Sequence, residues 1–289
     1  MSRLIVNADD FGLTAGVNRA VAELHRAGVL TSATLMSRAA ATDNAIDMAL
    51  STPTLGIGCH VVLVDGEPAL KPAELPSLVD ARTGRFQHKL SAFVQRLLAG
   101  RIKEAEIESE AAAQIAILQS RGVRLTHIDT HKHTHMFPAV LRPVLRAAKA
   151  AGIGAVRNPF EPAWSLRATP GIHLTRRVEV SMLRRFEAAF RQAVAEEGFV
   201  STDGAIGVLA TGSLDASTVA SLLTALPEGT YELVAHPGYN DAALAKTGTR
   251  LLASREAERN SLQKIKQFQS VGLVSFAELH ASAAQHAGN

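Results

Sequence analysis

Strand-like and helix-like segments alternate along this chain from one end to the other. After the first strand candidate, Thr14 suits a helix N-cap and Gly28 suits the end of that helix. Eight strands alternating with helices favour a (β/α) barrel over a sandwich or a helical bundle, although an open doubly wound sheet stays an alternative. The candidate strands cover residues 4–8, 31–36, 55–62, 124–130, 155–157, 205–210, 231–235 and 272–275.

The length of 289 residues, with 47% hydrophobic and 20% charged, suits a barrel that folds as one unit. We therefore expect an α/β barrel in a single domain over residues 1–289, without a linker. Alanine-rich stretches at 104–118 and 140–151 are interpreted as outer helices. The sequence contains no internal repeat of the kind that would indicate a solenoid.

Composition also narrows the partners and the compartment. The formal charge is +3 and aromatic residues make up 4%, so the basic stripe and stacking platforms of a nucleic-acid binder are lacking. Cys59 is the single cysteine, and the N-terminus begins with a strand rather than a signal segment, which predicts a cytoplasmic protein. No apolar run reaches the roughly 18 residues of a membrane-spanning helix, so any membrane contact would be peripheral.

Two connections are longer than packing requires, at residues 64–87 and 158–173. Both are rich in proline, and both follow candidate strands at the end where barrel sites lie. Long irregular loops in a compact domain are usually functional. We predict that each is a lid.

Asp9 and Asp10 follow the first candidate strand and precede Phe11 and Gly12. Neighbouring strand residues point to opposite faces, so both carboxylates can face one point only if the chain leaves the strand, and Phe11-Gly12 is expected to supply that departure. An Asp pair before a glycine also suits a turn or a helix cap. Candidate ligands at other strand ends favour a functional role.

Two isolated histidines also lie on candidate strands or at their ends. His60 lies among glycines and apolar residues, where a hydrogen-bonded core histidine and a ligand are both compatible with the sequence. Its neighbour Cys59 should point the other way, as a small buried hydrophobe. His236 follows a later strand and precedes two helix-breaking residues, so a turn-packing role and a functional role both stay open.

The segment of residues 126–135 is the strongest local signal, with four histidines within nine residues. His127, Asp129 and His131 share parity, so an extended chain would place them on one face. Such a density exceeds what a core accommodates without polar partners, and we expect at least one of these histidines to bind a metal rather than lie in a solvated loop. One carboxylate and two neutral imidazoles would leave positions for a water and a substrate oxygen.

Four motifs together resemble the YdjC-like carbohydrate deacetylases, the family that contains chito-oligosaccharide deacetylase. They are N-A-D-D-F-G at 7–12, G-x-x-C-H at 56–60, T-H-x-D-T-H-x-H-x-H-M-F-P at 126–138 and A-H-P-G at 235–238. The resemblance spans nearly the whole chain and implies a distorted TIM-like barrel with one divalent metal. Residue by residue, it implies Asp10, His60 and His131 as ligands, Asp9 as general base and His236 as general acid.

The same resemblance implies a hydrolase that removes the N-acetyl group of an acetylated amino sugar, releasing acetate and the free amine. The stretch 157–164 resembles the branch associated with hopanoid biosynthesis, whose substrate would be an N-acetylglucosaminyl hopanoid lipid. Soluble chito-oligosaccharides are the alternative. Substrate contacts or supports of the ligands would then come from His127, Asp129, His133, His135, Arg157 and Trp164.

The metal and the reaction class leave alternatives. Mixed His/Asp ligation suits Zn, Mn, Co and, less well, Mg. A metal-dependent phosphoesterase should show two close metals or a basic clamp, and only Lys132 and Arg157 lie near strand ends. A non-catalytic carbohydrate binder is a further alternative. A glycosidase using Asp9 and Asp10 is disfavoured, because sequence neighbours cannot readily flank a glycosidic bond at about 5 Å or more.

A lipid-linked substrate would require contact with the bilayer surface. Basic residues near an anionic leaflet contribute roughly 1 kcal/mol each, and tryptophan suits the interface. A solvated helix with Trp164 stacking on sugar is the alternative, and a homodimer is compatible with the sequence. The residues of the candidate membrane contact are Trp164, Arg176, Arg177, Arg184, Arg185 and Arg191.

Overall fold

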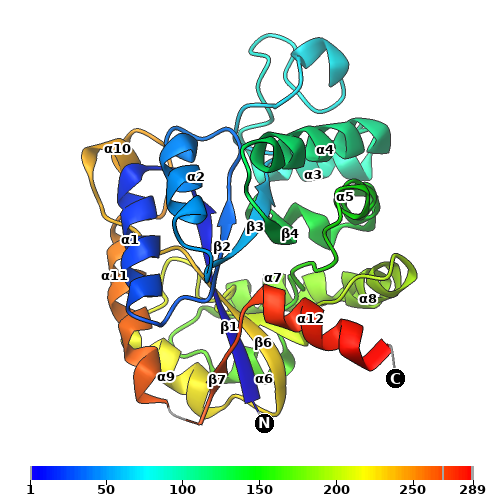
Figure 1. The fold of residues 1–289 in the computed structure, drawn as a ribbon. Helices are drawn as coiled ribbons and strands as arrows, with labels where there is room; N and C mark the ends of the chain where they lie inside the picture. Colours follow the sequence, from blue (N-terminus) through cyan, green and yellow to red (C-terminus); the bar gives the residue numbers. More distant parts are fainter. Residues whose placement is uncertain (1, 269, 288–289) are drawn as a thin grey trace.

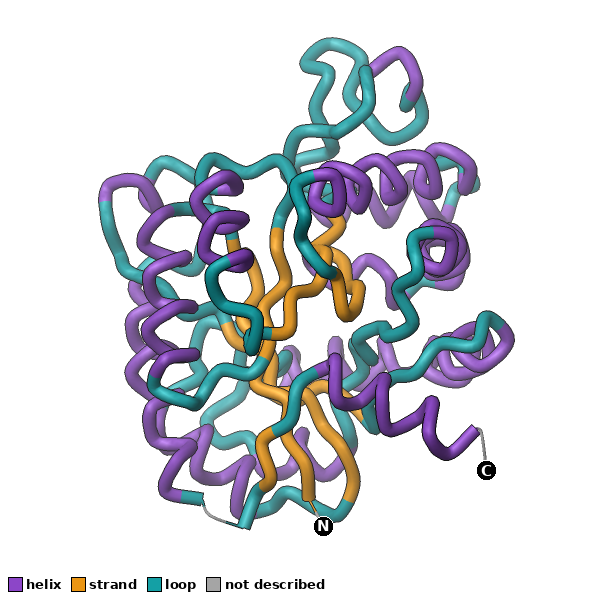
Figure 2. The backbone as a smooth tube through the Cα atoms, viewed as in Figure 1, coloured by secondary structure: helices purple, strands orange, loops and turns teal. Residues whose placement is uncertain are grey.

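The computed structural model describes residues 2–268 and 270–287 and is built around one parallel sheet (Figure 1). In this described part the sheet has seven strands, and the path through six of them is β4-β3-β2-β1-β6-β5. They are β1 (Ser2–Phe11), β2 (Ser32–Leu35), β3 (Gly56–Val61), β4 (Leu125–Thr130), β5 (Gly204–Ile206) and β6 (Gly229–Ala235). β7 (Gly272–Leu273) pairs with the start of β1. The sheet curls into a half-barrel (Figure 2), which confirms the distorted barrel.

The prediction of a strand at residues 155–157 is wrong. Only isolated bridges occur there, joining Val156 to Ile128 of β4 and Ala155 to Val200. The backbone of Ile128 donates to Ala155 at 3.0 Å and accepts from Arg157 at 3.1 Å. These bonds hold the segment beside β4, so Arg157 enters the interior without a regular strand.

Helices surround the sheet, with one group on the left and another on the right of Figure 1. The left group contains α1 (Ala15–Arg26), α2 (Thr42–Leu50), α9 (Ala216–Thr224), α10 (Ala242–Ala245) and α11 (Ala253–Leu262). The right group contains α3 (Leu90–Leu98), α4 (Glu104–Ser120), α5 (Pro138–Ala150), α8 (Glu187–Glu196) and α12 (Phe276–Ala287). The two predicted outer helices are therefore confirmed as α4 and α5. None of the helices described is both long and apolar enough to cross a membrane.

Further helical elements lie in the connections. They are α6 (Ala163–Ala168), α7 (Leu174–Leu183), η1 (Pro72–Glu74), η2 (His131–Met136), η3 (Arg184–Phe186) and η4 (Gln263–Gln267).

Local capping explains where α1 begins. As predicted, Thr14 caps α1, because its hydroxyl accepts a hydrogen bond from the Val17 amide. The apolar face of α1 is buried against the core cluster that β1 also enters.

The first long connection, residues 64–87, projects beyond the sheet (Figure 1) but is tied to α4. Three buried side chains of α4, spaced four residues apart, bind the chain before and within the loop. Gln114 bonds Val62, Glu110 accepts from the amides of residues 69 and 70, and Glu106 accepts from Ser77. A lid role for this loop stays a prediction. Movement of the whole loop away from α4 would have to break these hydrogen bonds.

Candidate metal centre

Asp10 lies at a backbone irregularity within β1. Its φ is 62°, a left-handed value that L-residues seldom adopt, and the β1–β2 register shifts between Ala8 and Phe11. The predicted departure at Phe11-Gly12 is therefore misplaced, since β1 continues to Phe11 and the irregularity is at Asp10 itself. Because of it, the adjacent side chains of Asp9 and Asp10 both reach one buried group of charged residues.

Asp10, His60 and His131 bring three donor atoms together at the carboxyl ends of β1, β3 and β4. The Oδ1 atom of Asp10 lies 3.6 Å from His60 Nε2 and 3.3 Å from His131 Nδ1, and the two nitrogens are 3.3 Å apart. Ligands of a tetrahedral zinc site, at about 2.0–2.1 Å from the metal, are about 3.3–3.4 Å from each other. The spacing of the donors therefore fits one small divalent cation.

His60 is oriented by Asp129, whose Oδ1 lies 2.7 Å from the Nδ1 atom of His60. Metal-binding histidines usually donate their other ring N–H to a carboxylate in this way, which leaves Nε2 free for the metal. Burial alone would lower the pKa of His60, but Asp129, Asp9 and Asp10 raise it to about 9. Asp129, which lies on β4 beside His60 of β3, thus supports the candidate ligand.

A second group of metal-type side chains, Asp9, His60 and Asp129, lies next to the first. The guanidinium of Arg157 already contacts both of its carboxylates, and it also binds Glu232 of β6. Arg157 and Glu232 are fully buried. Since a fixed cation neutralises this second group, the arrangement favours a single metal ion at the first group.

The side chain of Glu232 has an unusually high pKa. Burial raises the pKa of Glu232 to about 7, although Arg157 opposes the shift. Its Oε1 atom accepts from Arg157 Nε at 2.8 Å and Nη2 at 2.6 Å, whereas Oε2 is buried with no hydrogen-bond partner in the described structure. No sequence motif marks Glu232, although a charged residue in the middle of an apolar strand is a usable signal of a functional position.

His236 follows β6 and faces Asp9. Its Nε2 atom lies 3.8 Å from Asp9 Oδ2, and its Nδ1 atom lies 3.7 Å from Glu258 of α11. Burial works against the charged form, but Glu258 and Asp9 raise the pKa of His236. The imidazole therefore lies between two carboxylates, of which Glu258 belongs to no sequence motif.

The remaining histidines of the 126–135 segment occupy different environments. His127 is fully buried and stacks on Phe276 with ring centroids 3.9 Å apart, and burial lowers its pKa to about 3. His135 bonds the Thr130 hydroxyl and the carbonyl of Arg157, so it supports the fold around the site. The parity argument holds for His127 and Asp129 only, because β4 ends at Thr130 and His131 begins η2.

His133 and Trp164 complete the set predicted from the sequence. His133 and the preceding Lys132 both have left-handed φ values, 53° and 56°, and burial with Arg157 lowers the pKa of His133 to about 3. Two consecutive strained residues of this kind usually occur where function requires them. Trp164 packs edge-on against Tyr231 near the start of β6, whereas His236 follows the end of that strand.

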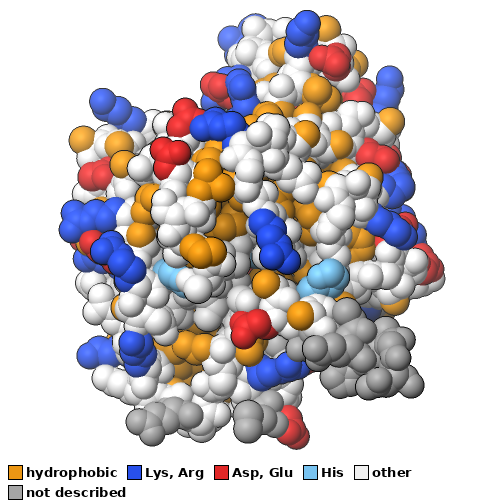
Figure 3. Space-filling view, in the orientation of Figure 1, with side chains coloured by type: hydrophobic (Ala, Val, Ile, Leu, Met, Phe, Trp, Pro, Cys, Tyr) orange, Lys and Arg blue, Asp and Glu red, His pale blue; other side chains and the backbone are white. Residues whose placement is uncertain are grey.

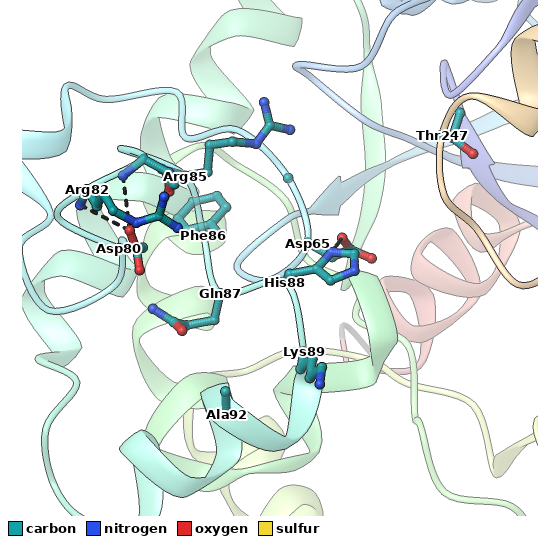
Figure 4. A pocket seen from close by; sticks show the side chains of 12 residues that line it. Asp65, Asp80, Arg82, Arg85, Phe86, Gln87, His88, Lys89, Ala92 and Thr247 are labelled. Carbon is teal, nitrogen blue, oxygen red and sulfur yellow. Dashed lines mark hydrogen bonds and ion pairs between the residues drawn. The ribbon is translucent and has the colours of Figure 1, made fainter.

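An open pocket of about 580 Å³ lies over the loop that follows β3 (Figure 4). Figure 4 shows His88 against Asp65 on one side and Thr247, from the segment after α10, on the other. Asp65 contacts His88 Nδ1 at 2.5 Å and accepts from Lys132 Nζ at 2.7 Å. Because Lys132 adjoins His131, this ion pair connects the pocket wall to the candidate metal centre.

Comparisons with known proteins agree with the motifs. The family model described as YdjC-like protein matches residues 3–270. A carbohydrate deacetylase of Brevibacillus brevis is 33% identical over 96% of this chain and 99% of its own length. A chitooligosaccharide deacetylase of Klebsiella pneumoniae is 35% identical over 82% of each chain.

Solved structures agree on the fold. An Enterococcus faecalis protein whose proposed role is cellobiose-phosphate cleavage superposes with a TM-score of 0.76 and 26% identity, over 96% of this chain and 98% of its own. A lactam utilization protein of Thermus thermophilus has a TM-score of 0.51 and 13% identity, over 94% of this chain and 99% of its own. At that identity the second likeness concerns the fold alone.

Proposed function

Because this chain belongs to the YdjC-like protein family, we propose that it is a metal-dependent carbohydrate deacetylase. The reaction is hydrolysis of the N-acetyl group of an acetylated amino sugar, with acetate and the free amine as products. The observation that carries this proposal is the triangle of donors from Asp10, His60 and His131 beside the facing pair Asp9 and His236. The names of the relatives support the same reaction.

Asp10, His60 and His131 would hold the cation. The chemistry that a divalent cation would supply there is polarisation of the acetamide carbonyl and a lowered pKa of a bound water molecule. One carboxylate and two imidazoles suit Zn, Mn or Co better than Mg. Asp129 accepts the Nδ1–H of His60, so Nε2 would face the cation, which must displace the proton that the raised pKa keeps on the ring.

Asp9 and His236 are assigned the proton transfers. Asp9 takes the proton of the attacking water, and His236, protonated, gives a proton from Nε2 to the leaving amine nitrogen. Burial opposes ionisation of Asp9, but Arg157 holds the pKa of Asp9 far below its usual range. Asp9 is therefore a weak base that stays ionised and in place, so its position more than its basicity must favour the proton transfer.

A phosphoesterase is disfavoured by the second group of carboxylates. That activity would use two close cations or a basic clamp open to substrate. Here Arg157 is fully buried and already engaged with Asp9, Asp129 and Glu232, so it neither leaves room for a second cation nor reaches a phosphate.

Whether the acetylated sugar is lipid-linked depends on whether the protein surface can bind a bilayer. A hopanoid-linked sugar stays our sequence-based prediction. Arg177 binds carbonyl oxygens of the 158–173 loop, Arg184 and Arg191 pair with Glu187, and Arg176 pairs with Glu179. On the face that Figure 3 shows, basic and acidic side chains are interspersed. These pairings favour a soluble oligosaccharide over a lipid-linked sugar, which would need free cations at the bilayer.

Acetate release tests the proposal. Metal-free protein is supplied in turn with Zn, Mn, Co or Mg and incubated with N-acetylglucosamine oligomers, an N-acetylglucosaminyl lipid in vesicles, and a phosphate monoester. Metal-dependent acetate release from an acetylated sugar, lost in His131→Ala, is the expected result. Phosphate release without acetate release would overturn the proposal.

A further inference from the structure

Two buried charged residues of α11 reach different parts of the site. Arg255 and Glu258 are each 1% exposed and lie three residues apart, so they project from one face of the helix. No sequence motif marks them. Their role rests on the proposed deacetylase function, because both residues contact side chains of the same site.

Arg255 binds one of the two carboxylate oxygens of Asp10 and leaves the other directed at the histidines. Its Nη2 atom donates to Asp10 Oδ2 at 2.6 Å, whereas Oδ1 is the oxygen that faces His60 and His131. A carboxylate held in this way offers a cation one oxygen in a fixed direction. Arg255 thus supports the carboxylate ligand as Asp129 supports His60.

Glu258 holds the other side of the site. Its Oε2 atom accepts the backbone N–H of His236 at 2.6 Å and lies 3.7 Å from His236 Nδ1. A carboxylate on the Nδ1 side favours a proton on Nδ1, which leaves Nε2 directed toward Asp9. Glu258 therefore fixes the backbone of His236 through a hydrogen bond and places a negative charge beside the Nδ1 side of its ring.

Close packing fastens the turn after His236 to the same helix. The amide of Gly238 donates to the carbonyl of Arg255 at 3.2 Å. A β-carbon at Gly238 would lie 3.1 Å from Arg255 Cδ and 3.2 Å from Val17 Cγ2, so a side chain would push the turn away from α11. Glycine thus allows this close contact without displacing Arg255 or Val17.

We propose that α11 is the positioning element of this site, with Arg255 fixing the carboxylate ligand Asp10 and Glu258 fixing the proton donor His236. Neither residue touches substrate in this arrangement, and each acts through another side chain. The helix couples the two halves of the site, so the metal and the proton donor keep a constant relation to each other.

The role of Arg255 is tested by zinc affinity, without a measurement of catalysis. Arg255→Met should weaken zinc binding to metal-free protein by about 10- to 100-fold in a chelator-competition titration. Arg259→Met on the same helix is the matched control and should keep the affinity of the parent. If Arg255→Met does not fold, Arg255→Lys is titrated instead and should also bind more weakly. Parent-like affinity in the folded variant would overturn the assignment.

The kinetics of a Glu258 variant distinguish a positioning role of this residue from a role in folding. Glu258→Gln should lower kcat by about tenfold or more, less than the loss of His236 itself, while KM and zinc affinity stay unchanged. Glu256→Gln, a half-buried position of α11 that bonds Asn240, is the control. An unchanged kcat in Glu258→Gln would overturn this role.

A second measurement on Glu258 does not depend on turnover. In protein with ¹⁵N-labelled histidine, at a pH high enough to make the imidazole neutral, the His236 signal, assigned by its loss in His236→Gln, should show the proton on Nδ1 in the parent and a changed tautomer mixture in Glu258→Gln. An identical signal in both would refute the positioning role. If the parent releases no acetate from any sugar, the proposed function fails, and the zinc titration and this spectrum still decide the positioning claim.

Discussion

Arg157 holds both carboxylate oxygens of Asp9, through Nη1 at 2.8 Å and Nη2 at 2.5 Å. The same guanidinium contacts Asp129, which in turn orients His60. One buried cation therefore connects the predicted general base to a predicted metal ligand. The position of each depends on Arg157, a residue outside every regular strand of the sheet.

Removing Arg157 should destabilise the protein severely. Arg157→Met leaves three buried carboxylates without their cation, and breaking a buried pair costs about 3–5 kcal/mol of unfolding free energy. Urea unfolding measures the loss. Arg146→Met, which breaks a half-exposed pair with Glu108, should stay within about 1 kcal/mol of the parent. Equal losses in the two variants would contradict the central role of Arg157.

His131→Ala should abolish stoichiometric metal binding, because it removes one of three donors. Emission spectroscopy on purified protein gives the metal content. His133→Ala serves as the comparison and should retain the metal, since His133 is not among the donors that meet at Asp10. Metal kept in His131→Ala but lost in His133→Ala would move the ligand assignment within the histidine cluster.

Asp9→Asn and His236→Ala should each lower kcat by about 10²- to 10⁴-fold while keeping the metal. Both residues lie beside the donor triangle without contributing to it. Asp9→Asn should also lower stability, because Arg157 loses a charged partner. Steady-state kinetics with a parallel metal analysis checks this, and activity near that of the parent in either variant would refute the assigned role.

Glu232 makes stability depend on pH in a predictable direction. Its pKa is about 7 in the folded chain against an ordinary value of 4.5, so folding favours the protonated form and the stability from this group falls as pH rises from about 4.5 to 7. Glu232→Gln removes the effect. The Tm of the variant relative to that of the parent should therefore increase between pH 5 and pH 8, and a difference independent of pH would contradict this interpretation.

Vesicle binding tests the lipid-linked substrate. Arg176, Arg184 and Arg191 pair with acidic side chains, Arg177 binds carbonyl oxygens, and Arg185 lies over the ring of Phe186. We therefore expect no salt-sensitive co-sedimentation with anionic liposomes. Charge reversal at Arg184 and Arg191 serves as the comparison. Strong binding that weakens with salt and with Arg184→Glu/Arg191→Glu would favour the hopanoid-linked sugar.

Periodicity located most elements because it reflects local geometry. The alternation of strands and helices, the Thr14 cap and the outer helices α4 and α5 depend on side-chain spacing and hydrogen bonding within one segment. Residues 155–157 differ, since their bonds to Ile128 and Val200 come from distant segments. Their pattern was strand-like, but neighbouring backbone and not local propensity decided the outcome.

The sequence by itself determined the donor types and the strand ends that carry them, because carboxylate and imidazole chemistry is written in residue identity and parallel strands share a carboxyl edge. Only the tertiary structure decided which groups meet. Asp10 turns into the site through a left-handed backbone, and Arg157, Glu232, Arg255 and Glu258 reach the site from segments outside the four sequence motifs. Long-range burial of charge requires partners in space, and a linear pattern does not specify those partners.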